Sequence, residues 1–122
     1  MEALIVEDND TNYLLVKTIL KREGWSVEQA RTLDGFRNGI EAKSYDLILL
    51  DVSLPDGDGI EALEALHRTK EEMPPVFVMT AHALKECQDR ASAAGASAFF
   101  AKPFSVTALQ SAVRALGAGG PC

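Results

Sequence analysis

The chain has 122 residues, of which 47% are hydrophobic and 25% charged, so it is long enough for one globular domain with a single core. Its formal net charge of −6 argues against direct binding to nucleic acid. Because no apolar run approaches the roughly 18 residues of a membrane-spanning helix and the acidic N-terminus is unlike a signal peptide, we expect a cytoplasmic protein. Cys87 and Cys122 lack the spacing of a metal site or a disulfide framework.

Short apolar runs and segments of helical periodicity alternate five times along the chain. The sequence predicts strands over residues 3–6, 25–30, 45–51, 76–79 and 98–101. It predicts a first helix that follows the polar turn at residues 9–12 and stops at Gly24, and further helices over residues 33–43, 59–73, 84–94 and 106–116. Caps are expected at the polar turn, at Thr32 and at Ser105. This alternation is typical of a parallel α/β sandwich with right-handed crossovers. We expect one domain over residues 1–117 and a flexible C-terminal tail over 118–122.

The segment from Leu47 to Gly59 organises the rest of the chain. Four apolar residues run without alternation into Asp51, which indicates a strand buried on both faces. Pro55, Gly57 and Gly59 follow, and they favour a loop. Taken alone, Asp51 would most simply cap a turn.

Four of the five predicted strands end in polar side chains: Glu7 and Asp8, Asp51, Thr80, and Lys102. The carboxyl ends of parallel strands lie along one edge of a sheet, so these side chains should converge. Crowded carboxylates repel one another unless a cation lies among them, and oxygen ligands favour Mg²⁺. With a lysine and a hydroxyl added, the set is typical of phosphoryl transfer. Singly, the same residues could be helix caps, a turn cap and a surface lysine.

Four motifs together resemble the receiver domain of two-component response regulators, the chemotaxis-regulator-like family. They are VEDN at Val6 to Asn9, LLDVSLPDGDG at Leu49 to Gly59, VMTAHA at Val78 to Ala83, and FFAKPF at Phe99 to Phe104. The resemblance covers nearly the whole chain. It implies a flavodoxin-like, doubly wound five-stranded parallel sheet in the order 2-1-3-4-5 with five helices.

The resemblance also implies a phosphoacceptor. Asp51 matches the aspartate that takes a phosphoryl group from a phosphohistidine of a histidine kinase or a histidine phosphotransfer protein. Lys102 and Thr80 match the residues that contact the phosphoryl oxygens. Lys102-Pro103 is similar to the family's cis peptide bond, which aims the lysine into the site.

The same resemblance implies a Mg²⁺ site at this edge. Asp8 and Asp51 would bind the ion directly, together with the backbone carbonyl of Ser53. Glu7 would act through a bound water.

Two further roles follow from the alignment of the motifs. Phe99 matches an aromatic switch residue that turns inward when Thr80 moves toward the phosphoryl group, and Phe100 is its less suitable neighbour. Phenylalanine departs from the family's commoner tyrosine, so we expect a bias toward the buried rotamer. Ser53 and His82 match positions that tune the lifetime of the phosphoryl group, although His82 could equally be an exposed loop residue.

The implied function is therefore a phosphorelay receiver that switches protein contacts with a downstream target. It is not a conventional enzyme, although it would catalyse its own phosphorylation and dephosphorylation. It could be a stand-alone regulator or the receiver of a hybrid histidine kinase. An interaction module that works without phosphorylation is an alternative. A metal-dependent phosphatase with an aspartyl nucleophile fits less well, because such enzymes usually carry a second aspartate where Ser53 stands.

Overall fold

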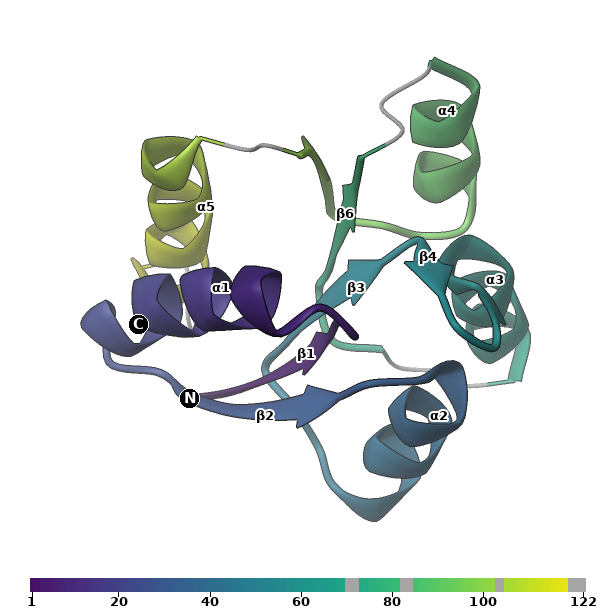
Figure 1. Ribbon diagram of the computed structural model, residues 1–122, viewed down its shortest axis with the longest axis horizontal. Helices are drawn as coiled ribbons and strands as arrows, with labels where there is room; N and C mark the ends of the chain where they lie inside the picture. The colour runs from purple at the N-terminus through teal and green to yellow at the C-terminus, as the bar shows by residue number, and fades with distance from the viewer. Residues whose placement is uncertain (70–72, 82–84, 103–104, 119–122) are drawn as a thin grey trace.

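A computed structural model describes residues 1–69, 73–81, 85–102 and 105–118 of the chain (Figure 1). The strands are β1 (Glu2–Val6), β2 (Ser26–Ala30), β3 (Leu47–Asp51), β4 (Ser53–Leu54), β5 (Gly57–Asp58), β6 (Val76–Thr80) and β7 (Ala98–Ala101). The helices are α1 (Asp10–Arg22), α2 (Leu33–Ala42), α3 (Gly59–Thr69), α4 (Lys85–Ala93) and α5 (Val106–Ala118). Within these described parts, no helix combines the length and the apolar character needed to cross a bilayer.

The main sheet contains five strands in the order β2-β1-β3-β6-β7, and all neighbouring pairs are parallel. Because β6 and β7 are its fourth and fifth strands along the chain, the predicted 2-1-3-4-5 order is confirmed. The central strand β3 is buried along its whole length, as its unbroken apolar run predicts. The edge strand β2 is exposed at alternate positions, which agrees with its weaker sequence pattern.

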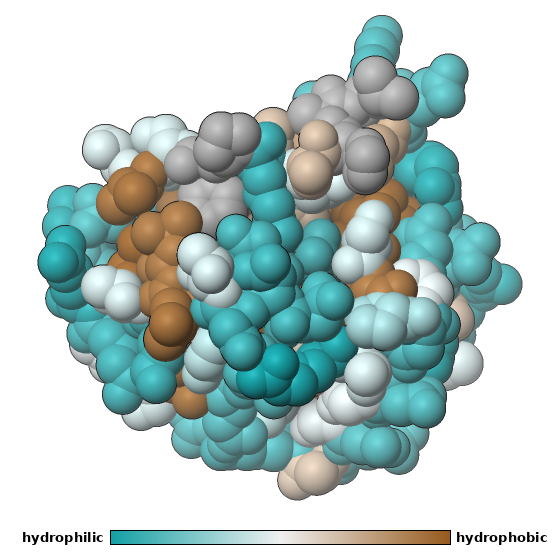
Figure 2. All heavy atoms as spheres, in the orientation of Figure 1, coloured by the Kyte–Doolittle hydropathy of each residue, from teal (hydrophilic) through white to brown (hydrophobic). Residues whose placement is uncertain are grey.

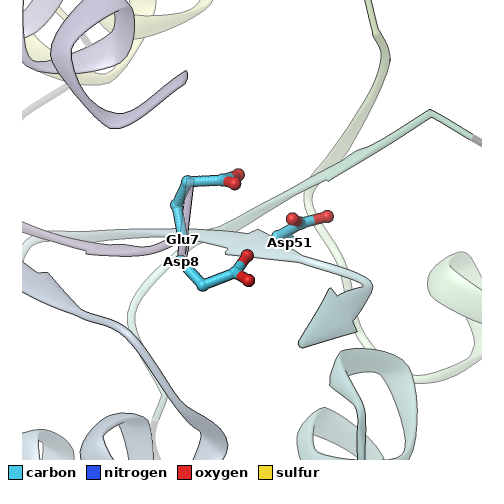
Figure 3. A group of neighbouring side chains, drawn as sticks. All are labelled: Glu7, Asp8 and Asp51. Carbon is cyan, nitrogen blue, oxygen red and sulfur yellow. The ribbon is translucent and has the colours of Figure 1, made fainter. Parts of the chain in front are cut away.

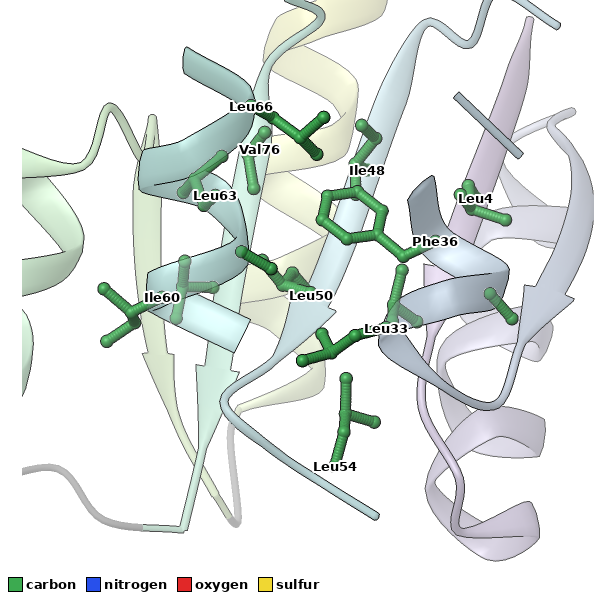
Figure 4. Close-up of a cluster of buried hydrophobic side chains, with 14 of the residues drawn as sticks. Leu4, Leu33, Phe36, Ile48, Leu50, Leu54, Ile60, Leu63, Leu66 and Val76 are labelled. Carbon is green, nitrogen blue, oxygen red and sulfur yellow. The ribbon is translucent and has the colours of Figure 1, made fainter. Parts of the chain in front are cut away.

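Helices cover both faces of the sheet, and each face has its own apolar core. On one side, α2, α3 and α4 pack against the sheet through a cluster centred on Phe36, Ile48, Leu50 and Leu63 (Figure 4). We call this the first core. On the other side, α1 and α5 cover a second core. The burial of both faces of β3 follows from this doubly wound arrangement.

The second core is built from alternate residues of the same strands. Leu47 and Leu49 point into it, together with Phe77 and Met79 of β6. Phe77 also contacts Phe100 of β7, with ring centroids 5.5 Å apart and planes tilted by 54°. One strand can therefore supply two cores, because successive side chains point to opposite faces.

The helix caps form where the sequence predicts them. The Asn9 side chain accepts a hydrogen bond from the backbone N–H of Asn12 at 3.0 Å, at the start of α1. Thr32 Oγ1 accepts from the N–H of Gly35 at 3.0 Å, and Ser105 Oγ accepts from the N–H of Ala108 at 3.2 Å. Each oxygen satisfies an N–H group that has no partner inside its helix.

The structure differs from the sequence prediction mainly in the loop after Asp51. Instead of an open loop, β4 and β5 form a short antiparallel hairpin, in which Ser53 pairs with Asp58 and Leu54 with Gly57. β2 and β3 start later than predicted, at Ser26 and Leu47, while α5 extends to Ala118, the first residue of the predicted tail.

Apolar side chains also reach the surface on the α1 and α5 side. Figure 2 shows a hydrophobic group there on a face that is otherwise largely hydrophilic. The large hydrophobic side chains of α1 and α5 that are exposed are those of Leu14, Leu15 and Val106. Single exposed apolar residues are common on soluble domains, so this group carries no functional conclusion by itself.

Candidate functional site

The carboxyl ends of the parallel strands bring together the polar residues that the sequence singled out. Glu7 and Asp8 follow β1, Asp51 ends β3, Thr80 ends β6, and Lys102 follows β7. The register of the central strands places Val6 beside Leu50, and Asp51 beside Met79. Residues far apart in sequence therefore meet at one edge of the sheet, as predicted.

Three carboxylates form the centre of the site (Figure 3). Glu7, Asp8 and Asp51 each place one oxygen within 4.8 Å of the others. Glu7 and Asp51 are buried, with 1% and 6% of their surfaces exposed, whereas Asp8 is exposed. Two negative groups are thus held away from water, and the third lies at the mouth of the site.

Lys102 supplies the positive charge. Its Nζ donates to Glu7 Oε2 at 2.8 Å and to Asp51 Oδ2 at 3.3 Å, and its side chain is only 14% exposed. The backbone N–H of Lys102 donates to the carbonyl of Thr80 at 2.7 Å, so the pairing of β6 and β7 continues to the site. The lysine is therefore fixed by its own backbone as well as by the two carboxylates.

Burial raises the pKa of Asp51 to about 6. The neighbouring negative charge of Glu7 raises it further, while Lys102 acts in the opposite direction. One lysine shared between two buried carboxylates does not offset the cost of removing Asp51 from water. The ionised form of Asp51 is therefore destabilised, and an added cation would favour it.

The donor set fits a hard divalent ion. All three clustered ligand atoms are carboxylate oxygens, which suit Mg²⁺ and do not suit a soft metal. Ser53, the further predicted ligand through its backbone carbonyl, lies in β4, two residues after Asp51, and its side chain is exposed.

Thr80 and Phe99, the predicted switch residues, lie on β6, which is next to β3, and on the edge strand β7, which is next to β6. Thr80 is buried at the end of β6, with 1% of its surface exposed. Phe99 is half-buried and packs against the first core, whereas Phe100 packs against the second core. The two phenylalanines therefore face different layers, and Phe99 shares its layer with α3 and α4. His82 and Pro103, and with it the predicted cis bond, lie outside the described residues.

Gly59 sets the distance between the site and α3. A Cβ atom at this position would lie 2.3 Å from the backbone oxygen of Asp51, which is closer than atoms can pack. The N–H of Gly59 also donates to the carbonyl of Val52 at 2.7 Å. Only glycine allows the first turn of α3 to pack against the end of β3.

Sequence reasoning missed the roles of Asp56 and Asp58 in the β4–β5 hairpin. Asp58 Oδ1 accepts from the N–H of Ile60 at 2.7 Å and caps α3, while its Oδ2 accepts from Arg90 Nη2 of α4 at 3.2 Å. Asp56 binds the start of α2. The signal was present in the repeated Asp-Gly pairs, because Asp is both a turn and a helix-capping residue.

The fold is that of a doubly wound, flavodoxin-like α/β domain, with a cluster of carboxylates and one lysine at the carboxyl ends of its strands. A model of the response regulator receiver domain matches residues 3–114, and the chain belongs to this family.

Known proteins of two kinds are similar to the chain. The aerobic respiration control sensor protein ArcB of Escherichia coli is 33% identical over 116 residues, which are 93% of this chain and 15% of that protein. The KDP operon transcriptional regulatory protein KdpE of Escherichia coli is 38% identical over 114 residues, 92% of this chain and 49% of that protein. The chain thus spans half or less of the length of these relatives.

Solved structures agree with this assignment. The crystal structure of a CheY-like response regulator receiver domain protein from Methanospirillum hungatei is 31% identical and superposes with a TM-score of 0.83. The match covers 98% of each chain. The likeness therefore extends over the whole domain.

Proposed function

We propose that this chain is the phosphoacceptor receiver domain of a two-component or phosphorelay system and that Asp51 is the residue that is phosphorylated. The observation that carries the proposal is the buried Asp51 carboxylate with the ammonium group of Lys102 at 3.3 Å. A carboxylate nucleophile for phosphoryl transfer needs nearby positive charge to offset the charge of the phosphoryl group.

The transfer forms one bond and breaks one bond. A carboxylate oxygen of Asp51 attacks the phosphorus of a phosphohistidine, which forms an acyl phosphate. The phosphorus–nitrogen bond breaks, its electron pair returns to the imidazole, and the imidazole takes up a proton. With a pKa of about 6, Asp51 is mostly ionised at neutral pH and can act as the nucleophile.

Lys102 and Thr80 bind the transferred group in this proposal. The Lys102 ammonium, now shared between Glu7 and Asp51, would pair with a phosphoryl oxygen. The Thr80 hydroxyl would donate to another. Both residues come from strand ends, so the sheet holds them in place before the phosphoryl group arrives.

Asp8 and Asp51, with the Ser53 carbonyl and with Glu7 through a water, would hold Mg²⁺. When bound, the ion offsets the repulsion between the attacking carboxylate and the anionic phosphoryl group. The fit of the clustered carboxylate oxygens to a hard cation supports this assignment.

Switching would use the β6–β7 side of the sheet. Movement of Thr80 toward the phosphoryl group would leave space for Phe99, which packs in the same layer as α3 and α4. The changed surface would then be read by a downstream protein. The phosphoryl donor would be a histidine kinase or a histidine phosphotransfer protein. Such a domain acts on itself and is not a conventional enzyme.

The relatives suggest two settings. ArcB is a sensor protein and KdpE a transcriptional regulatory protein, so the receiver could belong to a hybrid kinase or to a regulator.

Intact mass spectrometry tests the proposal. The protein is incubated with Mg²⁺ and acetyl phosphate, and we expect one added phosphoryl group. It should be lost in Asp51→Asn and without the metal, and retained in Asp34→Asn, which changes an exposed aspartate on α2.

An unmodified wild-type mass calls for a second measurement, because some receivers do not accept small donors. Beryllofluoride with Mg²⁺ mimics the phosphoryl group and should stabilise the wild-type protein against thermal unfolding. Absence of both responses would favour an interaction module that works without phosphorylation.

A further inference from the structure

The hairpin that follows Asp51 is attached to α2 by one carboxylate. Asp56 lies at the tip of the hairpin, between β4 and β5. Its Oδ1 accepts from the N–H of Leu33 at 2.8 Å, and its Oδ2 accepts from the N–H of Asp34 at 3.2 Å. These two N–H groups belong to the first turn of α2, and their hydrogen bonds hold the pKa of Asp56 below its usual range.

Two residues from different parts of the chain therefore share the N-terminus of α2. Asp56 accepts from the first two N–H groups, and Thr32 accepts from the third, that of Gly35, at 3.0 Å. N–H groups in the first turn lack partners inside the helix and favour a negative charge. Thr32 is a local cap, whereas Asp56 links the helix to the site loop.

Apolar packing holds the same junction. Leu54 of the hairpin and Leu33 of α2 are both buried in the first core (Figure 4). Gly57 has a φ of +147°, and a Cβ atom there would lie 3.1 Å from Leu33 Cδ1. A side chain at position 57 would be strained and would crowd Leu33, so glycine lets the hairpin lie close against α2.

The other end of the hairpin is held by α3 and α4. Asp58 caps α3 and accepts from Arg90, and the N–H of Gly59 closes the loop onto Val52. Asp56 at the tip and Asp58 in β5 thus attach one short hairpin to different helices. The backbone between Asp51 and this loop includes Ser53.

We propose that Asp56 is a positioning residue for the metal-binding edge of the site. By holding the hairpin on the N-terminus of α2, it fixes the backbone of Ser53 relative to Asp51, although Asp56 itself binds no metal. The inference rests on the proposed function, because the position of the Ser53 carbonyl matters to a site that takes Mg²⁺.

The test measures Mg²⁺ affinity by isothermal titration calorimetry in the absence of a phosphoryl donor. We expect Asp56→Ala to bind Mg²⁺ about tenfold more weakly, as is common when a residue that supports a metal ligand is lost. Asp56→Asn keeps one acceptor oxygen and should lie between Asp56→Ala and the wild type. Thr32→Ala is the matched control, because it removes a cap from the same helix without touching the hairpin, and its affinity should not change.

Hydrogen exchange gives a second, metal-free readout. In Asp56→Ala, amides of residues 52–59 should exchange faster than in the wild type, with the N–H of Gly59 as a reporter. In Thr32→Ala, faster exchange should be confined to α2.

Equal Mg²⁺ affinities for Asp56→Ala and Thr32→Ala, with a wild-type protein that does bind Mg²⁺, would overturn the inference alone. A wild-type protein that binds no Mg²⁺ would overturn the proposed function and the inference together. If Asp56→Ala does not fold, Asp56→Asn against Thr32→Ala decides the same question.

Discussion

Two clusters of the molecule hold a lysine between two carboxylates, and they differ in burial. At the carboxyl edge, Lys102 lies between Glu7 and Asp51, and its side chain is 14% exposed. Beside β1 and β2, Lys43 pairs with Glu2 and Glu28, and its side chain is 39% exposed. In both clusters one ammonium group contacts two carboxylates, so the comparison shows what burial adds.

The pKa of Glu28 in the exposed cluster and the pKa of Asp51 in the buried cluster shift in opposite directions. Hydrogen bonds from Lys43 and Tyr45 lower the pKa of Glu28, because in the exposed cluster they outweigh the cost of desolvation. In the buried cluster, desolvation is the larger effect and raises the pKa of Asp51 to about 6. The carboxylate in the exposed cluster is stabilised in its ionised form, whereas the buried cluster keeps a carboxylate whose ionised form an added cation can stabilise.

The largest expected effect is that of removing the buried lysine. Lys102→Met leaves Glu7 and Asp51 buried without their cation, and breaking such a pair costs about 3 kcal/mol of unfolding free energy. Urea denaturation at pH 7.5 with EDTA measures this loss. The loss of unfolding free energy should be smaller at pH 5, where Asp51 takes up a proton.

Lys43→Met is the matched control for this measurement. It removes a lysine from two exposed carboxylates, so its effect should be smaller than that of Lys102→Met and should fade further in high salt. Equal losses from the two substitutions would mean that burial does not distinguish the clusters.

The next-largest expected effect is a gain in stability, on removal of the Asp51 charge. Asp51 holds its proton more tightly in the folded than in the unfolded protein, so its contribution to stability falls as the pH rises from about 4 through about 6. A rise of the pKa by two corresponds to about 3 kcal/mol of unfolding free energy, and screening by solvent makes the effect smaller. We therefore expect Asp51→Asn to stabilise the metal-free protein by about 2 kcal/mol at pH 7.5.

The pH dependence and the metal provide the checks on this prediction. The advantage of Asp51→Asn should disappear near pH 4, where both proteins carry a neutral side chain, and it should shrink when Mg²⁺ is added to the wild type. An Asp51→Asn variant that is less stable than the metal-free wild type at pH 7.5 would contradict the raised pKa.

The sequence predicted the parts of the site that depend on local pattern. Unbroken apolar runs such as Leu47 to Leu50 identify buried parallel strands, and parallel strands bring their ends together, so Asp51 and Lys102 could be placed at one edge. The caps at Thr32 and Ser105 follow from short-range geometry in the same way.

The parts that were missed depend on contacts between distant segments. Whether Asp56 is a solvated turn residue or a cap on α2 depends on how the hairpin packs, and no periodicity in the chain records this. The same holds for the Lys102–Glu7 pair, which joins residues 95 positions apart. Local sequence defines which groups are available, and tertiary packing decides which of them are partners.

The smallest expected effect sharpens the comparison at the exposed cluster. Tyr45 is 8% exposed and its hydroxyl donates to Glu28 Oε2 at 2.8 Å. Tyr45→Phe removes this hydrogen bond while Glu28 keeps Lys43, so the loss should be about 1 kcal/mol. Burial and Glu28 raise the pKa of Tyr45 to about 12 from a usual value of 10.0, so the loss should be constant below pH 10 and should decline as the pH rises toward 12. Urea denaturation at pH 8 and above pH 10 measures this loss, and Tyr13→Phe on α1 is the control. A difference in unfolding free energy between the wild type and Tyr45→Phe that grows with pH would contradict the prediction.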